Sequence, residues 1–303
     1  MACFHPLKAF QRADGEVVFV EDRRCVRALD LPCGQCVGCR LERSRQWAVR
    51  CVHEASMHVD SSFVTLTYDD ERLSSMSLVY RDFQLFMKRL RKAKGFFDVD
   101  LWHWCPRFYM AGEYGDQFKR PHFHALLFGC FFPDREFLRS MPSGARLYRS
   151  GELERLWPFG FSSVGDVTFE SAAYVARYVM KKITGDAAAE AYEAVDGMTG
   201  EIVERLPEFN HMSLKPGIGA LWFDRYRREV FERDYCVING VKVQPPRAYK
   251  KRLAQVDLES AEFVAYGRSL RAEKFAEDGT PERLKVREAV SRARLSFKRR
   301  ILE

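Results

Sequence analysis

The run from Arg120 to Gly129 constrains the fold of this chain most, because its local composition predicts a β-strand with two histidines in alternation. Successive side chains of a strand point to opposite faces, so His122 and His124 share one face and Phe123 takes the other. Another strand is predicted over 104–113, and the short loop after it turns the chain back. The chain therefore contains a hairpin that presents two imidazoles side by side.

The elements around this hairpin indicate an antiparallel α+β domain. In chain order we predict a strand at 63–68, a helix at 80–94, strands at 104–113 and 121–130, short helices near 134–139 and 151–157, a strand at 161–167 and a helix at 170–183. Hairpins in place of regular βαβ alternation favour a sheet of ferredoxin or RNA-recognition type over a doubly wound parallel sheet.

The 303 residues and the apolar fraction of 47% allow one catalytic domain with extensions. We expect a cysteine-rich extension with a helix over 1–60, a central domain over 61–185 and a mostly helical extension over 186–303. The last part is predicted to contain a helix at 221–234 and a small hairpin at 235–243, with Asn239-Gly240 at its tip.

The histidine pair predicts a metal site if a third ligand lies nearby. Glu113 ends the preceding strand, and adjacent antiparallel strands lie about 5 Å apart, so its carboxylate can reach the same ion as His122 and His124. Asp116, in the connecting loop, is the alternative third ligand. Such a trio suits Mg²⁺ or Mn²⁺ acting on a phosphodiester, and it can also hold Zn²⁺ or Fe²⁺.

A second candidate feature is a pair of tyrosines on the helix at 170–183. Tyr174 and Tyr178 are four residues apart, so both phenols lie on one side of the helix. Arg177 and Lys181 each follow a tyrosine by three residues, and Lys182 is also close, where cations favour a phenolate or a phosphate. An aromatic pair in a core stripe is the alternative interpretation.

Cysteines cluster near the N-terminus in a pattern typical of metal sites. Cys33, Cys36 and Cys39 have C-x₂-C-x₂-C spacing, and structural Zn²⁺ takes four N or S ligands. Cys3 is the candidate fourth ligand and His5 the next. Free thiols, an iron–sulfur centre and a disulfide remain open alternatives. The N-terminus lacks the pattern of a secretory signal, so we expect reduced thiols and a cytoplasmic protein.

The charge balance permits a polyanionic partner. The formal net charge is +7 and the pI is near 8.9, values that plain solubility charge explains equally well. Arg120, Arg177 and Lys182 are the candidate DNA contacts. No apolar run is long enough to cross a bilayer, so no membrane partner is expected.

Taken together, these motifs resemble the HUH endonucleases. More closely, the chain is similar to the rolling-circle replication initiators of microviruses, in particular the gokushovirus branch. The resemblance is carried by the segments 63–68, 120–124 and 174–181 in this order, by the cysteine knuckle at 33–39 and by the opening residues 1–6. It covers residues 1 to about 185.

The resemblance implies a five-stranded antiparallel sheet with flanking helices. It also implies a metal-dependent DNA nickase in which His122, His124 and Glu113 hold Mg²⁺ or Mn²⁺. Tyr174 or Tyr178 would attack the phosphodiester of a single-stranded origin, leaving a 5′-phosphotyrosine and a free 3′-OH, and the second tyrosine would allow strand joining. No helicase motif is present, so a host helicase and polymerase in the bacterial cytoplasm would be partners.

Two other functions fit the same residues. One is a non-catalytic nucleic-acid-binding module with a zinc knuckle, which would bind without cutting. The other is a transposase or relaxase with the same chemistry, which would transfer a DNA end to a foreign target.

Overall fold

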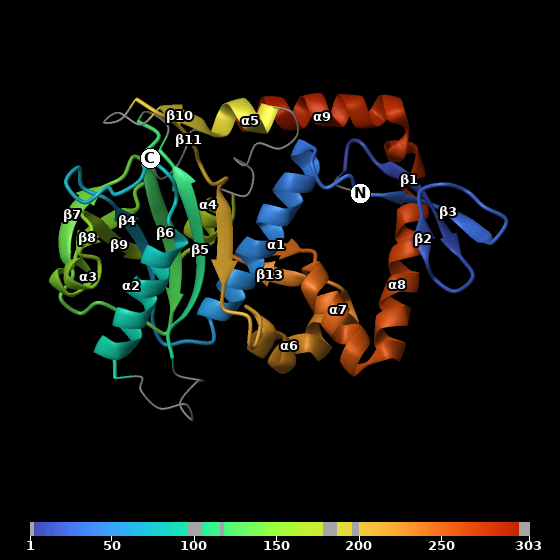
Figure 1. Cartoon of the computed structure of the whole chain (residues 1–303). Helices are drawn as coiled ribbons and strands as arrows, with labels where there is room; N and C mark the ends of the chain where they lie inside the picture. Colours follow the sequence, from blue (N-terminus) through green and yellow to red (C-terminus); the bar gives the residue numbers. More distant parts are fainter. Residues whose placement is uncertain (1–2, 96–104, 116–117, 178–186, 196–199, 297–303) are drawn as a thin grey trace. The chain divides into compact units, whose positions relative to one another are not determined.

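The computed structural model describes residues 3–95, 105–115, 118–177, 187–195 and 200–296. The chain divides into two compact units (Figure 1). One is built from described residues of Met1–Arg43 and Ala254–Arg300, and the other from those of Ser44–Leu253. The candidate catalytic residues lie in the second unit and the candidate zinc ligands in the first.

The second unit is organised by an antiparallel sheet with strand order β12-β5-β6-β4-β9-β8-β7. Its strands are β4 (Ser61–Thr67), β5 (Arg107–Tyr114), β6 (Pro121–Phe128), β7 (Glu136–Ser140), β8 (Arg146–Arg149), β9 (Ser162–Asp166) and β12 (Phe209–Met212). The histidine strand β6 lies between β5 and β4, with neighbours on both sides. The predicted antiparallel α+β class is confirmed.

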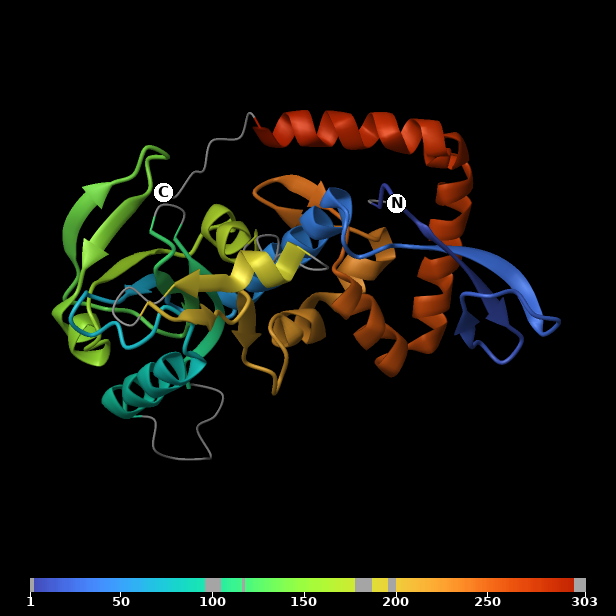
Figure 2. The same cartoon turned by 45° about the horizontal axis from the view of Figure 1, so that its top comes forward.

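The sheet differs from the expected five strands, because seven strands are joined in it within the described residues. The helix predicted near 134–139 is wrong, since these residues form β7 and pair with β8 around a tight turn in which Gly144 N–H donates to Met141 O. At the other edge β12 arrives from beyond residue 185 and pairs with β5 (Figure 2). Pairing between strands distant from the histidine hairpin thus enlarges the sheet.

Two hydrophobic clusters cover the two faces of this sheet. On one face α2 (Tyr80–Ala93) packs Phe83, Phe86 and Leu90 against alternate residues of β4, β5 and β6. On the opposite face α1 (Val37–Ala55) and α4 (Phe169–Arg177) pack against the other alternate residues. The imidazoles of β6 belong to the α4 face, so the core that holds the sheet also positions α4 beside them.

Smaller elements complete the second unit. They are α3 (Gly151–Leu156), α5 (Ala187–Tyr192), β10 (Glu193–Val195), β11 (Ile202–Glu204), α6 (Ala220–Arg233), β13 (Cys236–Ile238), β14 (Val241–Val243) and α7 (Arg247–Val256), which continues to the boundary. The predicted helix at 221–234 and hairpin at 235–243 are therefore confirmed, and Asn239 and Gly240 have the positive φ angles that their two-residue turn needs.

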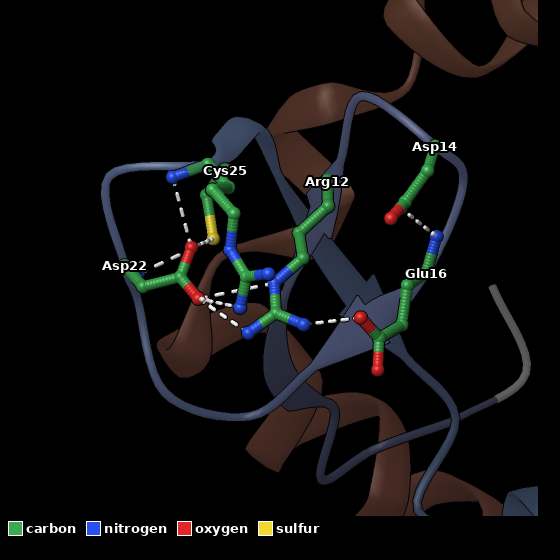
Figure 3. A network of polar contacts seen from close by, with 6 residues as sticks. Arg12, Asp14, Glu16, Asp22 and Cys25 are labelled. Carbon is green, nitrogen blue, oxygen red and sulfur yellow. Dashed lines mark hydrogen bonds and ion pairs between the residues drawn. The ribbon is translucent and has the colours of Figure 1, made fainter.

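The first unit contains a three-stranded sheet that the sequence did not predict. Its strands are β1 (Leu7–Arg12), β2 (Val17–Val18) and β3 (Cys25–Leu31), in the order β2-β1-β3. Arg12 ties its loops together, because its guanidinium forms ion pairs with both Asp22 and Glu16 (Figure 3). The unit also contains α8 (Leu258–Glu273), η3 (Ala276–Gly279) and α9 (Pro281–Ser296).

Within the described part of the chain, we find no helix with the length and apolarity that a membrane crossing requires.

Candidate active site

The three predicted metal ligands meet on the α4 face of the sheet. Glu113 on β5 lies directly opposite His122 on β6, and residues directly opposite on neighbouring strands share a face. Glu113 Oε1 is 2.7 Å from His122 Nε2 and 2.9 Å from His124 Nε2. The three ligand atoms lie within 4.8 Å of one another, so this trio can hold one metal ion.

The hydrogen-bond partners of His122 indicate a cation between its ring and Glu113. His122 Nδ1 lies 3.2 Å from the carbonyl oxygen of Arg120, which can only accept a hydrogen bond. A neutral imidazole has a single N–H, and here the N–H belongs at Nδ1. The lone pair of Nε2 then faces the Glu113 carboxylate, an arrangement that requires either a second proton on the ring or a metal ion.

Glu113 is ionised in this site. Its residue is only 2% exposed, and burial alone would raise its pKa. The hydrogen bonds from His122 and His124 more than offset that effect and hold the pKa of Glu113 at about 2. A buried carboxylate that stays charged is the form that binds a divalent cation.

Thr65 is a residue of this site that the sequence analysis did not single out. It lies opposite His124 on β4, and its Oγ1 is 3.0 Å from His124 Nδ1. This partner leaves His124 Nε2 directed at Glu113. The strand at 63–68 was predicted, but its pairing with the histidine strand was not, so the alternation within it carried no signal for Thr65.

The structure places Tyr174 beside the metal ligands. The Tyr174 ring, on α4, makes an edge contact with the His124 ring, with centroids 5.1 Å apart, and a second edge contact with Phe63. Tyr174 is half-buried. Tyr178, Lys181 and Lys182 lie outside the described residues, as does Asp116.

The two remaining predicted DNA contacts have different surroundings. Arg120 donates to the carbonyl of Tyr68 at 2.8 Å and forms an ion pair with Asp70, so its guanidinium already bonds the end of β4. Arg177 is the last residue of α4, one turn beyond Tyr174, and is half-buried.

The four predicted cysteine ligands also meet, in the first unit. The Sγ atoms of Cys3, Cys33, Cys36 and Cys39 lie within 4.8 Å of one another. His5, the alternative ligand, instead pairs with Glu288 at 2.7 Å.

Backbone N–H groups surround these sulfurs at the start of α1. Phe4 N–H donates to Cys36 Sγ, Cys33 N–H to Cys3 Sγ and Cys36 N–H to Cys33 Sγ, each at 3.3 Å. Burial raises the pKa of Cys36, but the backbone donors lower it further, to about 6. A thiolate is the form that binds metal.

Comparison with known proteins decides the family. The family model described as replication-associated protein ORF2 matches residues 61–183. The replication-associated protein VP4 of Bdellovibrio phage phiMH2K is 36% identical over 82% of this chain and 76% of its own length. The chain belongs to the replication-associated protein family of these phages.

Two further members of the replication-associated protein family match over most of the chain. ORF4 of Chlamydia phage 1 is 32% identical over 77% of this chain and 56% of its own length. ORF2 of Spiroplasma virus 4 is 30% identical over 84% of this chain and 80% of its own length. No solved structure matches. The predicted resemblance to microvirus replication proteins is confirmed.

Proposed function

We propose that this replication-associated protein starts rolling-circle replication by nicking single-stranded DNA with a tyrosine. The observation that carries the proposal is the position of Tyr174, whose ring contacts His124 while His124 Nε2 faces Glu113. A nucleophile next to a divalent-metal ligand set matches the needs of phosphodiester attack. The central domain, 61–185, would hold this chemistry on the HUH-type fold that the resemblance implies.

Glu113, His122 and His124 would hold Mg²⁺ or Mn²⁺, which when bound polarises the scissile phosphate. The tyrosine oxygen attacks the phosphorus, the P–O3′ bond breaks, and a 5′-phosphotyrosine forms. The phenolic proton goes to solvent, and the departing 3′-oxygen takes up a proton as the 3′-OH. Because the tyrosyl ester conserves the energy of the broken bond, a later 3′-OH can close the circle without ATP.

The tyrosines and cations of the helix have separate roles in this proposal. Tyr174 and Tyr178 would alternate as nucleophiles, and Lys181 would favour the phenolate through its positive charge. Arg120, Arg177 and Lys182 would contact DNA phosphates. The 3′-OH would serve a host polymerase, with a host helicase unwinding the duplex in the bacterial cytoplasm.

The cysteine cluster would hold a structural Zn²⁺. Four thiolates at the start of a helix, with backbone N–H groups donating to the sulfurs, fit a closed tetrahedral site. The 1–60 extension would then be a zinc-stapled module, and 186–303 a helical extension.

A nicking assay tests the proposal. Oligonucleotides tiled along the encoding single-stranded genome are incubated with the protein and Mn²⁺, then separated under denaturing conditions. We expect cleavage of one sequence with DNA attached to protein, and none with the double variant Tyr174→Phe/Tyr178→Phe. Binding of every oligonucleotide without cleavage would instead support a non-catalytic module and contradict the proposal.

A further inference from the structure

Phe161 is an exposed aromatic residue in the same transverse row as the metal ligands. Glu113 pairs with His122, and His122 pairs with Thr67 across β6 and β4. Leu66 pairs with Ser162, and continuing this register places Phe161 opposite Thr67, whose N–H donates to Phe161 O at 2.8 Å. The side chain of Phe161 therefore belongs to the face of the metal ligands, two strand spacings, about 10 Å, from His122.

This phenylalanine is exposed where the rest of the face is covered. Further along the strands, Phe63 and Leu126 of the same face are buried under α1 and α4. Phe161 is 71% exposed. The fold thus leaves one large aromatic ring open to solvent beside the proposed metal site.

The backbone that carries Phe161 is fixed. Trp157 Nε1 donates to Thr67 O at 3.0 Å, and Asp69 N–H donates to Phe159 O at 3.0 Å. Gly160 has a φ of 151° and packs so closely that an added Cβ would lie 2.3 Å from Asp69 N. Ordering a ligand on this ring would cost little backbone freedom, because the segment is already held.

The local charges favour recognition of a base over recognition of a phosphate. Arg120 pairs with Asp70, and Arg72 lies near Asp69 while donating to Pro158 O at 2.6 Å. Each of these two cations beside the Phe161 segment therefore has a carboxylate neighbour. An exposed ring with balanced charges around it suits the π-face of an unpaired base.

We infer that Phe161 is a stacking platform for an unpaired base of single-stranded DNA flanking the scissile phosphate. The inference rests on the proposed function, since the metal site sets where that phosphate lies. Stacking on one aromatic side chain contributes about five- to hundred-fold in affinity. It needs no phosphate contact, so it leaves the salt dependence of binding unchanged.

Binding measured without catalysis tests this inference. Fluorescence anisotropy with a labelled single strand and a duplex of the same sequence is recorded in EDTA, over a range of salt concentrations. For Phe161→Ala we expect single-strand affinity to fall about five- to hundred-fold with an unchanged salt slope and unchanged duplex affinity. Phe161→Leu should behave like alanine, and Phe161→Tyr and Phe161→Trp like the wild type.

Phe137→Ala is the matched control, because Phe137 is 61% exposed on β7, toward the far edge of the same sheet. It should bind like the wild type. Equal single-strand affinities for Phe161→Ala and the wild type would overturn the inference, as would a loss of affinity in Phe161→Trp. A wild type that stacks single strands through Phe161 but never nicks would overturn only the proposed function, since chelator removes nicking from the binding measurement.

Discussion

His124 is the residue on which the proposed metal site depends most, because its two ring nitrogens have different partners. Nδ1 lies 3.0 Å from Thr65 Oγ1 and Nε2 lies 2.9 Å from Glu113 Oε1. When Nδ1–H donates to the threonine hydroxyl, the Nε2 lone pair is free for an ion. Thr65 is therefore a positioning residue for this ligand.

We predict that Thr65→Val weakens Mn²⁺ binding about 10–100-fold, because valine keeps the shape but offers His124 no acceptor. Thr65→Ser retains the hydroxyl and should bind nearly as the wild type does. Isothermal titration calorimetry with Mn²⁺ measures both, and nicking by Thr65→Val should recover at higher Mn²⁺ concentration. An unchanged Mn²⁺ affinity in Thr65→Val would show that the threonine does not orient His124.

The predictability of the site divides at this residue. Alternation within one strand placed His122 and His124 on one face, and the short loop placed Glu113 beside them. Thr65 depends on which strand lies on the other side of β6, and that neighbour comes from about 60 residues earlier in the chain. Local patterns hold no information about such a pairing.

Among the elements, the β4–β9 connection depends on one glycine. Gly160 has a backbone conformation that L side chains rarely adopt, and an added Cβ would lie 2.6 Å from Thr67 O. We predict that Gly160→Ala lowers the free energy of unfolding by about 1–3 kcal/mol. Urea unfolding measures the change.

Gly151→Ala is the control for this glycine, because an added Cβ there meets its nearest atom at 3.6 Å, an ordinary contact. It should change the unfolding free energy by less than about 0.5 kcal/mol. A Gly160→Ala protein as stable as Gly151→Ala would contradict the close approach of this loop to β4.

The packing of α1 against α6 and α7 predicts a dependence of stability on pH. His53 of α1 stacks on Trp222 at 3.4 Å, and its Nδ1 is 2.9 Å from Tyr249 Oη. Burial lowers the pKa of His53 to about 3 from its usual 6.5. The folded state thus favours the neutral ring, so its contribution is complete above pH 6.5 and is lost as the pH falls toward 3.

We therefore expect the unfolding free energy of the wild type to fall with acid more steeply than that of His53→Phe, by about 1.4 kcal/mol per pH unit within this window. Urea titrations at about pH 7, 6, 5 and 4 give both slopes. Parallel slopes for the two proteins would show that His53 does not stay neutral in the fold.

Element prediction succeeded where a segment's own pattern decides its structure. The Asn239-Gly240 hairpin and α2 follow from turn chemistry and from apolar spacing. The first-unit strand β3 is exposed at most positions, so no alternation marked it. β7 is exposed throughout and takes its conformation from pairing with β8.

For the whole molecule, ligand chemistry assigns different metals to the two units. Cys3, Cys33, Cys36 and Cys39 are soft ligands suited to Zn²⁺, whereas two imidazoles and a carboxylate suit Mg²⁺ or Mn²⁺. We predict about one zinc per chain in the protein purified under reducing conditions, lost in Cys36→Ser and kept in His122→Ala. Inductively coupled plasma mass spectrometry measures it. Iron, or no metal, at this site would contradict the assignment.

The central claim is that a tyrosine beside Glu113, His122 and His124 becomes covalently joined to DNA. The most direct measurement is mass spectrometry of the peptide that carries the nucleotide after reaction with the cleaved oligonucleotide. We predict the adduct on Tyr174 or Tyr178, formed with Mn²⁺, absent in EDTA and absent in His122→Ala. An adduct on any other residue, or one that forms equally in EDTA, would contradict this claim.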